Sequence, residues 1–289
     1  MAAGTSPRPF FLIFDEMNLA RVEHYFSDLL SAMESGEPIY LHDDDDLAAD
    51  DESPIARRIA VAPNVFVTGT VNVDETTYMF SPKVLDRAFV LECNHVDLSA
   101  LGGGPVSTTA SSPLALTRMG SELRARSGHA GDEWQRFSAL LDGTLASRLR
   151  SIHAVLASEH RHFGYRVARE IARFVDLAAE QTDGSPEALR AAFDVAVLSK
   201  VLPKLNGGQA ELEPVVQRLF RLACGDDVVA GADGVDEPVE LAAFAPSPAA
   251  SRTGLVRATG ASLERPRTAL KLWRMLRRLR THGFAGFIE

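Results

Sequence analysis

Two acidic residues directly follow a short apolar run near the start of the chain. Phe10–Phe14 is continuously apolar and rich in β-favouring residues, which predicts a buried strand of a parallel sheet. Asp15 and Glu16 come immediately after it. Carboxylates at such a strand end suit nucleotide hydrolysis, in which an Asp helps to hold Mg²⁺ and a Glu orients or deprotonates the attacking water. The plainer alternative is a strand end whose acids face solvent.

A second strand ends in a neutral polar residue. Val65–Thr70 is rich in β-branched residues, and Val71 and Asn72 follow it. Because ligands bind at the carboxyl ends of strands in such sheets, Asn72 is expected to position a water beside the γ-phosphate of a nucleotide. The chain between the two strands predicts one helix, which ends at Gly36 and whose apolar residues recur at helical spacing: Leu19, Val22, Phe26, Leu29, Leu30 and Met33. A hairpin with a solvated acidic tip is expected next, with strands Pro38–Leu41 and Arg58–Val61.

A short helix should then present an arginine. Ser81 followed by Pro82 is a helix-start signal, and Arg87 lies at the end of the predicted helix. A rigidly placed Arg in this position suits stabilisation of transition-state charge. The alternative is that Arg87 pairs with Asp86 or Glu92 at the surface.

These segments together resemble motifs of AAA+ ATPases. Phe11–Asn18, Gly69–Glu75 and Leu85–Phe89 look like the Walker B, sensor 1 and arginine-finger motifs, and the branch they resemble most is the McrB-like, dynein-related group, with its MoxR-like relatives. His162–Val167 looks like the sensor 2 region, Val201–Gly207 resembles a lid motif of that group, and Leu272–Glu289 resembles its C-terminal end.

The resemblance implies an α/β fold: the C-terminal portion of a P-loop NTPase parallel-sheet core, followed by an α-helical lid domain. It makes Asp15 the magnesium residue, Glu16 the catalytic base, Asn72 sensor 1 and Arg87 a finger that acts on a neighbouring subunit. Arg166 is the sensor 2 candidate that contacts phosphate, with a solvated helix residue as the alternative. The implied cofactors are ATP and Mg²⁺, and the implied activity is ATP hydrolysis within a homo- or hetero-oligomeric ring.

The sequence departs from the family pattern in two places. A phosphate-binding loop needs G-x-x-x-x-G-K-[ST], and none of the four lysines follows a glycine. Truncation of the start, a loop supplied by a separate polypeptide, and loss of catalysis all explain this absence, and truncation is favoured because the hydrolytic residues are present. McrB itself resembles a GTPase in which Asp is the third residue after the Asn. In this chain the third residue after Asn72 is Glu75, so GTP is less expected than ATP.

Composition and the positions of segments rich in glycine and proline indicate three regions. The expected regions are a partial AAA+ core over 1–97, a linker or insertion over 98–131, and a helical lid over 132–289 with a loop-rich insertion at about 225–260. Helices are expected over 134–158, 165–180, 186–201, 213–223 and 267–280. The last carries several arginines, which suit either nucleic-acid contact or, as favoured here, the solvated face of an amphipathic helix.

Net charge, cysteine content and the length of the apolar runs indicate which partners and which location are expected. The 289 residues carry a formal net charge of −9, which argues against general coating of nucleic acid but not against a local basic patch. Two cysteines and the absence of a long apolar run favour a reduced cytoplasmic location and no membrane.

Two functions stay open. The first is an AAA+ ATPase that drives DNA translocation or restriction, with a nuclease or DNA-targeting partner, or that remodels macromolecules. The second is a non-catalytic ring subunit that supplies Arg87 to a neighbour.

Overall fold

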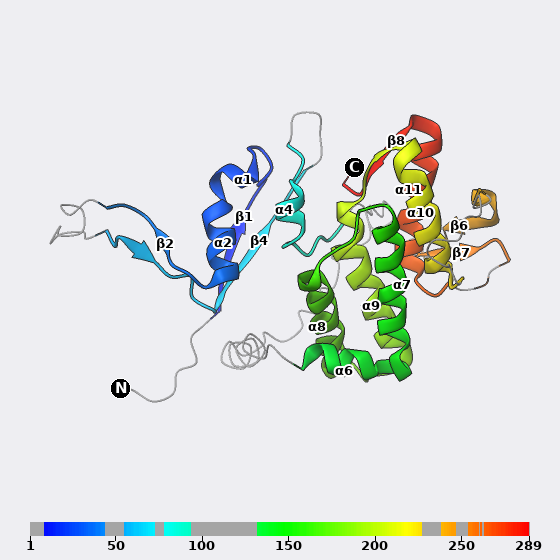
Figure 1. Cartoon of the computed structure of the whole chain (residues 1–289), viewed down its shortest axis with the longest axis horizontal. Coiled ribbons are helices and arrows are strands. Elements are labelled where there is room, and N and C mark those ends of the chain that lie inside the picture. Colours follow the sequence, from blue (N-terminus) through cyan, green and yellow to red (C-terminus); the bar gives the residue numbers. More distant parts are fainter. Residues whose placement is uncertain are drawn as a thin grey trace, which may run out of the picture. The chain divides into compact units, whose positions relative to one another are not determined.

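The computed structural model describes residues 9–43, 55–72, 78–93, 132–226, 238–246, 254–259, 261 and 263–288. The described residues up to Arg87 form one compact unit, and those from Ala88 onward form a second (Figure 1). The architecture is mixed α/β, and each sheet in the described part has two strands. The expected linker over 98–131 lies wholly outside the described residues.

The first unit is built on a parallel pair of strands. β1 (Phe10–Phe14) pairs with β4 (Val65–Gly69), with Phe10 opposite Val65 and Phe14 opposite Gly69. Both expected strands and their parallel pairing are present and their carboxyl ends lie side by side, but the expected burial of the first strand is wrong. The helices described alongside them are α1 (Val22–Tyr25), α2 (Ser27–Ser35) and α4 (Pro82–Leu85). Their small core consists of Val22, Phe26, Leu30 and Val84, against which Phe14 and Val67 pack.

The expected single helix after β1 is wrong in one respect. The backbone leaves the regular helix at Phe26, which separates α1 from α2, and Leu19 and Met33 lie exposed rather than in the core. Gly36 ends α2 in the left-handed conformation at φ 73°, as expected for a residue without a Cβ. The expected hairpin is present as β2 (Ile39–Tyr40) and β3 (Arg58–Ile59), which pair antiparallel. Most of its acidic tip lies outside the described residues.

The first strand is unusually exposed for its composition. Phe10, Phe11, Leu12 and Ile13 retain 63%, 56%, 42% and 66% of their accessible surface. Parallel sheets are normally covered on both faces, which is the reason their strands are apolar throughout. The sequence of β1 is therefore that of an interior strand, whereas its surroundings in the described part of the chain are those of an uncovered one.

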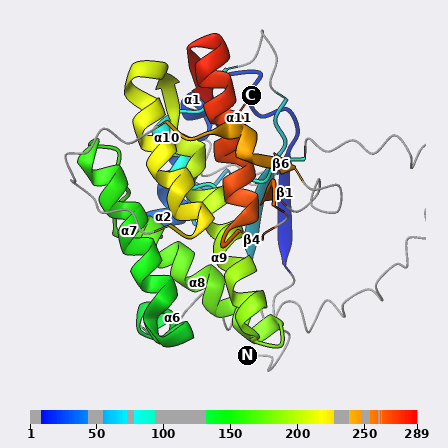
Figure 2. The ribbon, with the colours of Figure 1, turned by 90° about the vertical axis from the view of Figure 1, so that its right-hand side faces the viewer.

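The second unit is a helical bundle, and its helices are shown in Figure 2. Its elements are α6 (Glu133–Ala139), a 3-10 turn (Leu140–Gly143), α7 (Thr144–Ser158), α8 (Tyr165–Gln181), α9 (Pro186–Lys200), a 3-10 turn (Leu202–Lys204), α10 (Gln209–Cys224) and α11 (Pro266–His282). The expected helix over 134–158 is in fact two helices. Leu141, Asp142 and Gly143 all have positive φ, and this turn ends α6 before α7 begins.

Two short ribbons complete the bundle. β5 (Asn206–Gly208) pairs antiparallel with β8 (Phe284–Gly286), and β6 (Phe244–Pro246) pairs antiparallel with β7 (Leu255–Arg257). The second ribbon corrects the expectation that 225–260 is all loop. A 3-10 turn, Leu241–Ala243, leads into β6.

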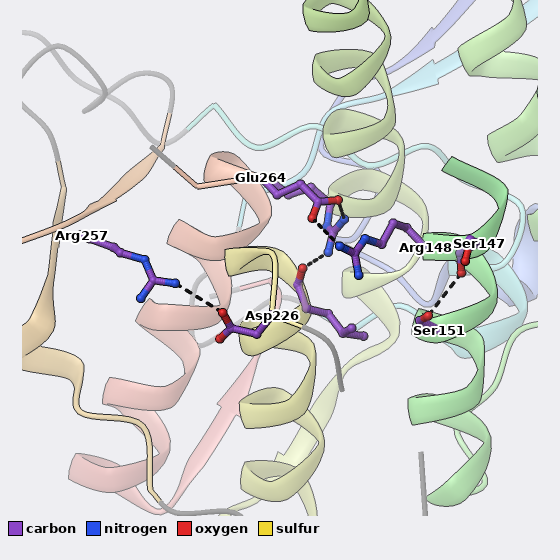
Figure 3. A network of polar contacts seen from close by, with 8 residues as sticks. Ser147, Arg148, Ser151, Asp226, Arg257 and Glu264 are labelled. Atoms are coloured by element: carbon purple, nitrogen blue, oxygen red, sulfur yellow. Dashed lines mark hydrogen bonds and ion pairs between the residues drawn. The ribbon is translucent and has the colours of Figure 1, made fainter. Parts of the chain in front are cut away.

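Polar contacts fix the start of α11 within the bundle (Figure 3). Glu264 accepts from Arg265 at 2.6 Å and pairs with Arg148 of α7 at 3.2 Å. Arg265 is buried and donates to the carbonyl of Leu222 near the end of α10. Arg257 of β7 meets Asp226, just after α10, at 3.4 Å. The segment before α11 is thus tied to two other helices by charged groups.

An extended segment after Arg87 also belongs to the second unit. Buried Lys200 donates to the Ala88 carbonyl at 2.9 Å and pairs with Glu170. Lys271 pairs with Glu92 at 2.5 Å, and the Phe89 ring stacks on Phe174. Residues 88–92 are therefore held to the bundle by two lysines and an aromatic contact.

Candidate functional site

The parallel strands place the acidic pair beside the sensor 1 candidate. Asp15 and Glu16 follow β1, Asn72 follows β4, and the Asn72 amide nitrogen lies 3.3 Å from the Glu16 carboxylate. The backbone reinforces this approach, since the Thr70 amide donates to the Phe14 carbonyl at 2.9 Å and the Met17 amide donates to the Thr70 carbonyl at 3.0 Å. The structure therefore brings together three of the residues selected from the sequence.

Thr70 organises both acids. Its hydroxyl donates to the Asp15 carboxylate and accepts from the Glu16 amide at 2.9 Å. One hydroxyl can serve as donor and acceptor at once, so a single side chain directly after β4 orients the loop after β1. Sequence reasoning assigned no role to Thr70, although it lies inside the segment that resembles sensor 1. The sequence feature that could have identified Thr70 is a hydroxyl residue at the end of a predicted strand.

Glu16 has an unusual backbone conformation. Its φ is 51°, in the left-handed region that residues with a Cβ visit rarely and at about 1–2 kcal/mol. The Thr70 hydroxyl holds this conformation through the Glu16 amide, and the Leu19 amide closes the turn by donating to the Glu16 carbonyl at 3.1 Å. Such outliers concentrate at functional sites, where the surrounding contacts over-determine the backbone.

Asn18 connects the loop after β1 to the segment after β4. It is buried, donates through its amide nitrogen to the Asn72 carbonyl at 2.7 Å, and accepts from the Tyr78 amide through its backbone carbonyl at 3.0 Å. Its side-chain oxygen is buried without a hydrogen-bond partner among the described residues. A buried acceptor without a partner favours the binding of a hydrogen-bond donor such as water. Sequence reasoning included Asn18 in a motif without giving it a task.

Close packing explains the glycine before Thr70. A Cβ built on Gly69 would lie 2.0 Å from the Met17 sulfur, so any larger residue must displace that side chain. Met17 also accepts a 2.7 Å hydrogen bond from the Tyr25 hydroxyl at its carbonyl. The loop that carries Asp15 and Glu16 is thereby packed against the end of β4 and tied to α1.

Arg87 is held within its own unit. Its guanidinium pairs with Glu34 and donates to the Leu30 carbonyl, both on α2, and its side chain is 18% exposed. Its Nε is buried without a partner among the described residues. The sequence alternative named Asp86 or Glu92 as the partner, whereas the structure pairs Arg87 with Glu34. In this conformation the guanidinium is engaged by α2, and a role in a neighbouring subunit requires it to leave Glu34.

Arg166 belongs to the second unit. It lies exposed in the first turn of α8, after an extended Gly164 that begins the helix without a side-chain cap. The first amides of a helix and a nearby guanidinium both favour an anion. Its role as sensor 2 stays a prediction.

The donor chemistry of the acidic pair fits Mg²⁺. Among the described residues, no group of three or more His, Cys, Asp or Glu residues is arranged to hold a metal. Mg²⁺ in nucleotide sites usually takes only one or two carboxylates, with water and phosphate oxygens as its other ligands. An exposed Asp15 carboxylate that is oriented by Thr70 meets that requirement, so Asp15 would hold the ion when nucleotide is bound.

Comparison with known proteins defines a family. Residues 130–284, more than half of the chain, match the model described as "Domain of unknown function (DUF8727)", and the chain therefore belongs to that family. The match covers the helical unit and not the acidic pair. No curated protein and no solved structure matches the chain.

In the part of the chain that the structure describes, no helix combines the length and the apolar character needed to cross a bilayer.

Proposed function

We propose that this chain carries the hydrolytic half of an AAA+-type ATPase site, as part of an oligomeric ring related to the McrB-like group. The observation that carries the proposal is the meeting of Glu16 and Asn72, 3.3 Å apart, at the carboxyl ends of two parallel strands. A solvated acidic strand end needs neither a matching amide on the next strand nor a hydroxyl that orients both acids.

Each residue has a distinct task in this proposal. Asp15 holds Mg²⁺, which supplies positive charge beside the phosphates when it is bound. The Glu16 carboxylate accepts a hydrogen bond from, and finally a proton of, the attacking water. The Asn72 amide fixes the direction of that carboxylate and lies close enough to hold the same water. Thr70 keeps both acids in place, so that little reorganisation is needed when nucleotide arrives.

The proposal requires a phosphate-binding loop to complete the site. The 289 residues contain no glycine-rich phosphate loop, whose amides and lysine bind the β- and γ-phosphates of ATP. The exposed apolar side chains of β1 fit this requirement, because helices cover both faces of the parallel sheet in a P-loop core. ATP is preferred over GTP in the proposal, and the macromolecule acted on is DNA or a protein complex.

The alternative function, a non-catalytic ring subunit, rests on Arg87. It requires the guanidinium to exchange Glu34 and the Leu30 carbonyl for a neighbour's nucleotide. Intact Asp15, Glu16, Thr70 and Asn72 favour the hydrolytic function, since a subunit that only donates an arginine has no use for them.

Steady-state phosphate release from ATP by the full-length protein tests the proposal. Glu16→Gln should lower kcat by about 10²–10⁴-fold, the usual contribution of a general base, while ATP binding persists. Glu37→Gln, an equal change at an exposed carboxylate of the same unit, is the matched control and should leave kcat unchanged.

The two functions give different outcomes in this assay. Equal turnover in Glu16→Gln and wild type would refute the assigned base. Arg87→Ala should suppress turnover while sparing ATP binding if Arg87 acts on a neighbour. A protein that neither binds nor hydrolyses ATP, but stimulates a partner ATPase in an Arg87-dependent way, would establish the alternative.

A further inference from the structure

The last long helix carries a concentration of positive charge in an acidic protein. Within α11 there are six arginines and lysines and no aspartate or glutamate, whereas the whole chain has a formal net charge of −9. The charge is therefore collected on one element. Such a collection is either incidental to a solvated helix face or the footprint of an anionic partner.

The packing of α11 is complete without its exposed arginines. Leu272, Met275, Leu276 and Leu279 are fully buried, which confirms the amphipathic helix expected from the sequence. The two less exposed basic residues have carboxylate partners: Lys271 pairs with Glu92 and Arg280 pairs with Glu213. The other arginines of α11, including Arg278, which also has a partner, are exposed and are not needed to fill the core.

Three of these arginines form a straight row. Arg267, Arg274 and Arg278 are all exposed, and separations of seven and eleven residues place them within about 40° of one another around the helix. The row is about 16 Å long at 1.5 Å per residue. Arg277 flanks it, with its guanidinium 4.8 Å from the centroid of the Trp273 ring. Trp273 is itself fixed by a 3.1 Å hydrogen bond to the Leu241 carbonyl, so Arg277 is preordered beside the row.

We propose that this arginine row binds the phosphate backbone of double-stranded DNA. A row of arginines along one face of a helix complements a regular line of phosphates, which Arg contacts in a bidentate manner. The inference goes beyond the proposed hydrolytic site, because it involves no nucleotide and no residue of the first unit.

The same face is poorly suited to other nucleic acids. Single strands are bound by stacking bases on exposed aromatic rings, but Trp273 is only 9% exposed and lies beneath Arg277. Double-stranded RNA is recognised largely through its 2′-hydroxyls, which need polar side chains in addition to cations. The hydroxyl of Thr281, the only one on the exposed face of α11, already donates to the Arg277 carbonyl at 2.8 Å. Duplex DNA is the partner that these residues favour.

The salt dependence of binding measures the number of contacts. Three neutralised phosphates predict a slope of about −2.7 for the logarithm of affinity against the logarithm of salt concentration on duplex DNA. Affinity should then fall about 40-fold between 50 and 200 mM salt. Because contacts to phosphate carry no sequence information, unrelated duplexes should bind equally well.

Fluorescence anisotropy with a labelled 20-base-pair duplex, without nucleotide, tests the proposal on the full-length protein. Arg274→Ala should weaken binding to every duplex and make the slope shallower by about 0.9. Arg274→Lys keeps the charge and should keep the slope. Arg150→Ala removes an exposed arginine from α7, which packs on α10, and should change neither quantity. If Arg274→Ala lacks the wild-type helical circular dichroism, Arg267→Ala takes its place.

Several results would overturn the proposal. They are a wild-type protein that binds no duplex at 50 mM salt, an Arg274→Ala slope equal to that of the wild type, or tighter binding of single-stranded than of duplex DNA. None of these results depends on ATP turnover, so failure here and failure of the proposed ATPase are separate outcomes.

Discussion

Replacing Asp194 with alanine should destabilise the helical unit more than the loss of an ordinary helix cap does. Asp194 lies on α9 and is 2% exposed, and its carboxylate accepts from the backbone amides of Arg267 and Thr268, both at 2.9 Å. It thus caps the first turn of α11 from another helix. Its backbone carbonyl also accepts from the Thr268 hydroxyl at 3.1 Å, so the two helices are joined at this point by three hydrogen bonds.

The magnitude follows from the groups left behind. Asp194→Ala leaves two amide donors at the start of α11 without an acceptor, at about 1–3 kcal/mol each when they are buried. Burial raises the pKa of Asp194, so the ionised carboxylate is itself penalised near neutral pH, and its removal offsets part of the loss. A net decrease of about 3 kcal/mol in the free energy of unfolding is expected, or about 6–12 °C in Tm for a domain of about 150–250 residues.

Urea unfolding followed by circular dichroism at 222 nm measures this loss. Ser185→Ala is the matched control, since Ser185 caps its own helix, α9, by accepting one bond from the Ala188 amide at 3.2 Å. That variant should lose about 1 kcal/mol. If Asp194→Ala loses no more than Ser185→Ala does, the cross-helix cap does not stabilise the bundle in the way described.

Two further predictions concern one residue in each unit. Burial acts to raise the pKa of Glu213, but hydrogen bonds from Arg280, Gln209 and Gln217 outweigh it and hold the pKa below the usual 4.5; the stability contributed by Glu213 is therefore present above pH 4.5 and lost as pH falls through the lower folded-state value. Glu213→Gln should lose about 1–2 kcal/mol at pH 7 and show a weaker acid dependence in urea midpoints, and an unchanged acid dependence would contradict this assignment. In the first unit, Gly69→Ala should force the flexible Met17 side chain to move and destabilise by about 1 kcal/mol, the lower end of the cost of overpacking. Faster hydrogen exchange in β1 and β4 would report this loss; the added substitution Met17→Ala should slow that exchange again, and an equal rate in the double variant would exclude the clash.

The strand ends were predictable because their signals are local. An apolar run followed by Asp15 and Glu16, and a β-branched run followed by Asn72, each predict a strand with a polar carboxyl end. Parallel pairing then brings the ends together, and the structure has this arrangement. The identity of the chemistry performed there stays a prediction.

Other features depended on contacts that no local pattern reveals. The partner of Arg87 is Glu34, more than fifty residues earlier in the chain, whereas sequence proximity pointed to Asp86 and Glu92. Thr70 and Asn18 gained their roles only when β1 and β4 were placed side by side. The turn between α6 and α7 was missed because Leu141 and Asp142 adopt positive φ without a proline before α7, and a single glycine such as Gly143 does not by itself end a helical pattern.

The exposed β1 has a consequence for the chain during its synthesis and storage. Phe10–Phe14 is an uncharged window of five large apolar residues without proline, the composition that favours intermolecular β-pairing and aggregation. In the described part of the chain, one edge of β1 is unpaired, and such an edge favours pairing with other chains. The chain should therefore aggregate more readily than a protein whose apolar strands are covered, which would lower its steady-state abundance in the cell.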